Sequence, residues 1–273
     1  MPDTPYLVTR GVVLRETLTK ETDKILTLLT ETHGKLPVIA RGARRKNSKH
    51  AAAAQTLVWS EWSLYRRGDW YYAREETALE LFEGLRGDLD ALALAFYFAE
   101  LTEAVALEDA PPGPLLPHLL NGLYALSTLH KPPELVKPAF EWKLLSFAGY
   151  EPFADACAYC GTPDPEIPVF DTVQGVLSCQ TCGAAERSPA VVKPLCRDSL
   201  AALRHAVYGD AKKLYAFRLS GAALDRFSQA AEAFTAAQLE RKFKTLDFYK
   251  SLHTGGYDNG KREGPAVDPG PGQ

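Results

Sequence analysis

Four cysteines form the pattern with the clearest chemical meaning in this sequence. Cys157 and Cys160 enclose two residues, Cys179 and Cys182 enclose two residues, and eighteen residues separate the pairs. This spacing is typical of a tetrathiolate zinc site, because two such turns facing each other supply four sulfurs at the corners of a tetrahedron. Glycine follows Cys160 and Cys182 and allows each turn to close tightly.

We expect the four cysteines to hold one structural zinc ion. Four thiolates fill a tetrahedral shell, whereas catalytic zinc keeps one position for water. The alternatives are reduced, unligated thiol pairs or a redox pair, which the lack of a surrounding thioredoxin-like βαβ pattern disfavours. Residues 151–194 hold few apolar side chains, so we expect the metal to supply the folding energy of this segment. Cys196 lies outside the spacing and is interpreted as a buried or incidental thiol.

A cationic stretch is the second candidate site. No acidic residue occurs between Glu31 and Glu61, and six basic residues occur there, five of them within nine positions. The interspersed Gly, Asn and Ser residues predict an exposed, mobile loop that contacts phosphates, although a merely solvated basic face is the alternative. The predicted DNA contacts, with two arginines from a later turn, are Lys35, Arg41, Arg44, Arg45, Lys46, Lys49, Arg66 and Arg67.

Short β-segments must carry this stretch. Tyr6–Leu14, Asp23–Thr30 and Leu36–Ala40 are rich in apolar and β-branched residues, and Thr56–Tyr65 and Trp70–Arg74 flank a turn of hairpin length. Five strands in residues 1–80 predict a small barrel of the OB-fold type, with an SH3-like barrel as the alternative. Rings that could stack on unpaired bases are present, but most must fill the barrel; they are Trp59, Trp62, Tyr65, Trp70, Tyr71 and Tyr72.

From residue 88 the apolar period becomes helical. Helices are expected over Asp88–Asp109, Leu115–His130, Glu134–Phe147, Arg197–Val207 and about Ser220–Leu252. The predicted architecture is therefore a multidomain β plus α chain: an OB-fold-like barrel in residues 1–80, then an all-α domain in residues 81–252 with a zinc knuckle inserted at about 151–194. Residues 253–273 lack an apolar pattern and predict a flexible tail.

Composition and missing motifs exclude several functional classes. No apolar run approaches the ~20 residues of a membrane span, no signal peptide is present, and an odd cysteine count disfavours secretion, so a cytoplasmic protein without membrane contact is expected. No hydrolase or dinucleotide-binding motif occurs. Gly255–Lys261 matches part of a phosphate-binding loop, but Arg262 replaces the required Ser or Thr and no strand precedes it. An enzyme is disfavoured.

Charge is distributed unevenly along the chain. Residues 1–80 carry 13 Lys and Arg against 10 Asp and Glu, whereas the remainder carries 18 against 24. An excess of cations confined to the front part is a sign of an anionic partner for that part.

Several segments together resemble the bacterial RecO family of recombination mediators. They are Gly11–Arg15, Asp23–Thr30 with Gly34, Ala40–Arg45, Phe140–Leu145, Ala148–Pro152, and the two cysteine pairs with Phe170 and Gly175 between them. The resemblance spans residues 6 to about 250. It implies an N-terminal OB-fold, a helical domain with the zinc knuckle, and a structural role for a zinc ion that not all members retain. It also implies binding and annealing of single- and double-stranded DNA, partnership with RecR and with the acidic tail of single-stranded-DNA-binding protein, and loading of RecA onto gapped DNA at the nucleoid.

These lines lead to one hypothesis and two rivals. A cationic barrel surface that holds two phosphate backbones close together would reduce their repulsion and let bases pair without covalent chemistry. A zinc-dependent hydrolase is one rival, and nuclease or ATPase activity would reveal it. A zinc-stabilised adaptor that binds an acidic protein without touching DNA is the other, and DNA mobility shifts distinguish it.

Overall fold

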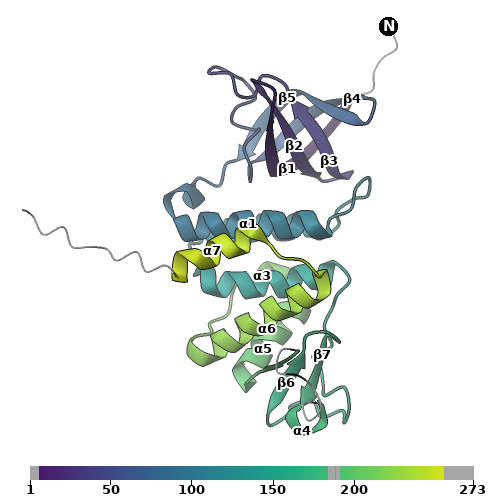
Figure 1. The fold of residues 1–273 in the computed structure, drawn as a ribbon, viewed down its shortest axis with the longest axis vertical. Coiled ribbons are helices and arrows are strands. Elements are labelled where there is room, and N and C mark those ends of the chain that lie inside the picture. The colour runs from purple at the N-terminus through teal and green to yellow at the C-terminus, as the bar shows by residue number, and fades with distance from the viewer. Residues whose placement is uncertain (1–5, 184–187, 189–190, 255–273) are drawn as a thin grey trace, which may run out of the picture.

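The protein is elongated, with a β-barrel at one end and the cysteine-rich segment at the other (Figure 1). The computed structural model describes residues 6–183, 188 and 191–254. A body of helices lies between the two ends. Within the described residues no helix is both long and apolar enough to cross a membrane.

The barrel is closed in the strand order β1-β2-β3-β5-β4. Strands β3 and β5 pair in parallel, while β4 pairs antiparallel with both β1 and β5. This five-stranded Greek-key closure is that of an OB-fold, so the predicted barrel is confirmed and the SH3-like alternative is wrong. The strands are β1 (Tyr6–Thr19), β2 (Asp23–Thr30), β3 (Gly34–Ala40), β4 (Trp59–Arg67) and β5 (Trp70–Glu80).

Alternation of side chains along the strands fills the barrel. The interior holds aliphatic residues around Trp62, which is 1% exposed and donates its Nε1–H to the Gly11 carbonyl at 3.3 Å. A β-carbon on Gly11 would stand 2.9 Å from the Leu29 carbonyl oxygen, so glycine lets two strands cross closely there. Trp62 is therefore core, and Trp59 packs against the helices instead.

Within the described residues the body is built from seven α-helices, two short 3-10 helices (η1 and η2) and a small sheet. The strands of this sheet lie in the order β7-β6-β8. The sequence predicted an all-α domain, so this sheet was not expected. The elements are η1 (Glu83–Gly87), α1 (Leu89–Val105), α2 (Leu115–Ser127), α3 (Pro133–Phe147), β6 (Pro168–Asp171), β7 (Val176–Cys179), α4 (Gln180–Gly183), β8 (Val192–Pro194), α5 (Arg197–Tyr208), η2 (Ala211–Lys213), α6 (Gly221–Leu239) and α7 (Lys244–Thr254).

The last apolar segment is two helices and not one. Glu240 adopts φ 49° and ends α6, and α7 begins four residues later at Lys244. The break turns Phe243 into the core, where its ring meets Tyr97 edge-on with the centroids 5.6 Å apart. It also lays α7 along α1 (Figure 1). Of the predicted tail, the residues from 255 onward lie outside the described part of the chain.

Two strands of the predicted cysteine-rich insertion, β6 and β7, are anchored to the helices by apolar contacts. Phe170 of β6 and Leu177 of β7 are fully buried in the same apolar cluster as the helices. Phe170 meets Trp142 of α3 edge-on, with ring centroids 5.1 Å apart. The expectation that this segment lacks apolar anchoring is therefore wrong for β6 and β7. A contribution of the metal to folding stays a prediction for the two cysteine turns.

The central helix α3 is buried along Leu135–Leu145, charged residues included. Lys137 Nζ lies 2.9 Å from one Glu141 oxygen and 3.1 Å from Glu232 of α6. Tyr97 of α1 donates its hydroxyl to Glu141 at 2.8 Å, and Lys250 of α7 reaches Glu232 at 2.6 Å. Burial lowers the pKa of Lys137, but the two carboxylates outweigh this and hold its pKa above the usual value. One ion network thus joins four helices.

Removal of one partner from this network should destabilise the fold. Lys137→Met leaves the Glu141 carboxylate buried without its cation, which typically costs about 3–5 kcal/mol. Urea denaturation followed by far-UV circular dichroism measures the loss. The double variant Lys137→Met, Glu141→Gln retains an acceptor for Tyr97 and should recover most of the stability, and Lys242→Met, at an exposed position, should change little. Equal stability of the wild type and Lys137→Met would contradict this account.

Candidate nucleic-acid interface and metal centre

The four predicted cysteine ligands come together in space. The sulfurs of Cys157, Cys160, Cys179 and Cys182 all lie within 4.8 Å of one another. In a tetrahedral thiolate site with metal–sulfur bonds of about 2.3 Å, neighbouring sulfurs are about 3.8 Å apart. The Cys160 and Cys179 sulfurs are 3.6 Å apart, so the cluster has the dimensions of a metal site.

Local hydrogen bonds set the two cysteine turns. The Gly161 amide donates to the Cys157 carbonyl at 2.9 Å, and the Cys157 amide donates to the Thr162 carbonyl at 2.8 Å. Gly161 adopts φ 73°, a conformation that glycine takes without strain. Cys179 ends β7, Cys182 lies in α4, and the Cys179 amide donates to the Cys157 sulfur at 3.3 Å.

The electrostatics of the cluster favour a bound cation. Hydrogen bonds from the side chain and backbone of Thr162 lower the pKa of Cys160 to about 6. Desolvation and the neighbouring Cys160 raise the pKa of Cys179 to about 12. Adjacent sulfurs therefore resist a second negative charge unless a cation lies between them. Four cysteines are positioned to bind a metal ion, and they leave no coordination position for a substrate.

The fifth cysteine belongs to a different local structure. Cys196 is the N-cap residue of α5 and forms a capping box with Ser199, whose hydroxyl lies 2.7 Å from the Cys196 amide. The thiol is half-buried and stands apart from the quartet. Cys196 therefore caps α5 and is not part of the quartet.

The predicted basic loop is a sequence of turns over residues 41–58, and its backbone is anchored to the barrel, which corrects the expectation of a mobile loop. The Gly42 amide donates to the Asp23 carboxylate at 2.8 Å, a bond that lowers the pKa of Asp23, and the Arg44 amide donates to the Thr22 carbonyl at 3.0 Å. Ala43, Ala53 and Ala54 of the loop are buried in the barrel core. The anchored backbone leaves the long basic side chains directed outward.

The structure groups seven of the eight predicted DNA contacts on exposed parts of the barrel. Five lie on the loop and two at the end of β4, all exposed: Arg41, Arg44, Arg45, Lys46, Lys49, Arg66 and Arg67. Arg41 and Arg66 lie over the rings of Tyr72 and Tyr71, neighbours on β5, at 4.7 and 5.8 Å. The loop and the β4–β5 turn therefore present their cations near the start of one strand.

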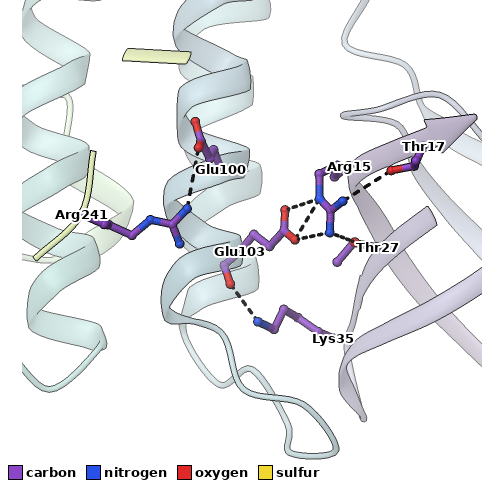
Figure 2. A network of polar contacts seen from close by, with 7 residues as sticks. All are labelled: Arg15, Thr17, Thr27, Lys35, Glu100, Glu103 and Arg241. Atoms are coloured by element: carbon purple, nitrogen blue, oxygen red, sulfur yellow. Dashed lines mark hydrogen bonds and ion pairs between the residues drawn. The ribbon is translucent and has the colours of Figure 1, made fainter. Parts of the chain in front are cut away.

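Lys35 lies elsewhere. Its Nζ donates to the Glu103 carbonyl at 2.9 Å, so it faces α1 across the junction between barrel and helices (Figure 2). The structure thus separates Lys35 from the basic loop.

The junction contains a hollow of about 630 Å³ lined by both signs of charge. Arg15 of β1 binds the Glu103 carboxylate of α1, with its nearest nitrogen at 2.9 Å, and Arg241 lies 3.8 Å from Glu100 (Figure 2). Carboxylates from α1 thus offset these cations, whereas none of the five loop cations forms an ion pair within the described residues. The loop therefore carries more uncompensated positive charge than the junction.

Arg74 of β5 is a cation that the sequence reasoning missed. Its guanidinium lies 4.4 Å from the Tyr6 ring centroid, and its carbonyl accepts a hydrogen bond from Lys49 Nζ at 3.1 Å. Its position beside the loop follows from strand pairing. Proximity to Tyr72, two residues earlier on the same strand, is the only sequence signal that could have indicated it.

Comparison with known proteins gives consistent matches over nearly the whole chain. The family models for the N terminal and C terminal of recombination protein O match residues 5–82 and 86–247. The DNA repair protein RecO of Acetivibrio thermocellus is 32% identical over 247 residues, covering 90% of this chain and 97% of the relative. Those of Thermoanaerobacter sp. and Symbiobacterium thermophilum are 30% and 31% identical, covering 90% and 89% of this chain and 98% and 96% of the relatives.

The four clustered cysteines lead to a prediction about how much metal the purified protein binds. Cys160→Ser or Cys182→Ser removes one of four thiolates, so the protein purified at neutral pH should lose most of its bound metal because the remaining ligands hold it less tightly. Cys196→Ser is the matched control and should leave the metal content unchanged. Elemental analysis of dialysed protein measures the ratio of metal to chain. Equal metal content in all three variants would place the metal elsewhere.

Proposed function

We propose that this chain, which belongs to the RecO family of DNA repair proteins, binds single- and double-stranded DNA through the basic loop and anneals complementary strands. The family consists of non-catalytic recombination mediators. The observation that carries the proposal is the set of five exposed loop cations. None of them forms an ion pair within the described residues, and an anchored backbone presents them from an OB-fold barrel.

Annealing follows from charge and not from covalent chemistry. Two strands repel each other through their phosphates, and bound cationic side chains replace condensed counterions and bring the backbones together. Arginine and lysine contacts to phosphate carry no sequence information, so bases remain free to find their complements. A loop that does not recognise sequence suits a protein that acts on any gap.

The partners in this proposal come from the family. We include RecR and the acidic tail of single-stranded-DNA-binding protein, with loading of RecA onto gapped DNA as the outcome, in the cytoplasm at the nucleoid. The contribution of this chain's own residues would be to hold DNA at the barrel, while other surfaces hold the proteins.

We also propose that the bound metal is a single zinc ion with a structural role. Thiolate ligands in a tetrahedral set favour zinc, and a filled shell leaves no position for catalysis. The cluster lies at the end of the molecule opposite the barrel (Figure 1). Zinc would therefore fix the two cysteine turns on the body and make no contact with DNA at the basic loop.

Charge reversal on the loop tests the proposed DNA binding. The variant Arg44→Glu, Arg45→Glu, Lys46→Glu should lose annealing of complementary oligonucleotides, because three phosphate contacts become repulsive. On duplex DNA the log–log slope of affinity against salt should become shallower by about 3, from about -4.5 for the five loop contacts. Fluorescence anisotropy at several salt concentrations measures the slope, and strand annealing is followed by energy transfer between labelled oligonucleotides.

A second triple variant controls for net charge. Lys212→Glu, Lys213→Glu, Lys242→Glu makes the same change at exposed positions of the helical body and should retain annealing. Annealing that survives the loop reversal would refute the proposal. Wild-type protein that ignores DNA at low salt but binds an acidic peptide would support the adaptor function instead.

A further inference from the structure

Three tyrosines form a row across the outer face of the barrel. Tyr6 of β1 pairs directly with Tyr65 of β4, and Tyr65 pairs directly with Tyr72 of β5. Residues paired across strands point to the same face of a sheet. The adjacent residue Leu64 is fully buried in the barrel core, so the tyrosine row faces outward.

The rings of the row are accessible. Tyr6 is 50% exposed, and Tyr65 and Tyr72 are half-buried. Tyr65 and Tyr72 stack with their centroids 5.2 Å apart and their planes 17° apart. The helical body shares its apolar cluster with barrel residues outside the row, namely Val12, Leu14, Leu29 and Leu57. The body therefore leaves the row open.

Cations flank the row and join it to the basic loop. Arg41, the first residue of the loop, lies 4.7 Å from the centroid of Tyr72, and Arg74 lies 4.4 Å from that of Tyr6. Lys49 of the loop donates to the Arg74 carbonyl at 3.1 Å. Glu75 is the nearby opposing charge, at 4.0 Å from Arg74, and as an exposed pair this contact is weak. Aromatic rings and phosphate-binding cations thus form one continuous surface.

We propose that the tyrosine row Tyr6, Tyr65 and Tyr72 is a stacking site for unpaired nucleobases, and that Arg41, Arg74 and the loop hold the adjoining phosphates. This inference rests on the proposed DNA-binding function and deepens it. Every base has a π-face, so stacking on tyrosine accepts any sequence, and each guanidinium that now lies on a ring is placed to turn toward a phosphate.

The tyrosine row would make the protein bind single strands more tightly than duplex DNA. Bases in a duplex stack on one another and offer no free face, so only an unpaired strand gains from the row. A base that stacks on a surface ring keeps its pairing edge in solvent. The held strand would therefore remain able to pair with a complementary strand.

An abasic oligonucleotide separates stacking from phosphate contact. We would compare an oligonucleotide of about 20 thymidines, longer than the roughly 4–16 nucleotides that one OB-fold spans, with an abasic strand of equal phosphate count. The full-length wild type should bind the thymidine strand about tenfold or more tightly, by anisotropy at fixed salt. The variant Tyr65→Leu, Tyr72→Leu keeps only Tyr6 of the row and should lose most of this preference, with its abasic affinity unchanged.

Two further variants test whether the effect requires loss of the rings and whether it is specific to the row. Tyr65→Phe, Tyr72→Phe keeps the rings and should retain the preference, while Tyr124→Leu removes an exposed ring from the helical body and should also retain it. Tyr6→Leu, at the first residue of β1, tests the row with the stacked pair intact and should reduce the preference. Thermal unfolding verifies that each variant is folded.

The outcomes distinguish this inference from the proposed function. Equal wild-type affinity for the two strands, or an undiminished preference in Tyr65→Leu, Tyr72→Leu, would overturn the stacking site while leaving loop binding in place. Failure of the wild type to bind either strand would overturn the proposed function, and the stacking site with it.

Discussion

The buried charge network on α3 is the constraint around which the body is built. A lysine and a glutamate in the core are tolerated only when each has its partners, and here the partners come from α1, α6 and α7. The same helix places Trp142 against Phe170 of β6 and Phe234 of α6. Because α3 touches the helices next to the barrel and the sheet next to the cysteines, it fixes the two ends of the molecule with respect to each other.

The barrel packs directly against the helical body. Val12 and Leu14 of β1 and Leu29 of β2 belong to the apolar cluster of the helices, and Arg15 is held by the Glu103 carboxylate. The cations at the junction are used to join the parts, whereas those of the loop stay exposed. The junction cations and the loop cations therefore differ in one respect. A facing helix supplies carboxylates to the junction cations and, in the described part of the chain, none to the loop cations.

Patterns of local spacing could be predicted from the sequence, and contacts between distant segments could not. The period-two strands, the helix α3 and the cysteine quartet each depend on residues close in the chain, and the structure has each of them at the predicted place. Two strands are longer than predicted, since β1 continues past Leu14 to Thr19 and β5 past Arg74 to Glu80. Lys35 reads as part of the basic stretch, but a single turn of the chain at Gly34 directs it toward α1. Likewise, the sequence does not distinguish Tyr65 and Tyr72 from the other aromatic residues of the barrel. The register of β4 and β5 places these two side by side.

Register also explains why the barrel exposes cations and aromatic rings next to each other. Alternation along β4 sends Trp62 and Leu64 inward to fill the barrel, and the same alternation sends Tyr65 outward. The loop after β3 begins at the level where β3 pairs with Tyr72, so its first cation comes to lie over that ring. Closure of the barrel through the β3–β5 pair therefore brings together a cationic loop and an aromatic row that are separated in sequence. A slip of one residue in β5 would bury the ring and separate the two, so the surface depends on the packing of the barrel core and not on the loop alone.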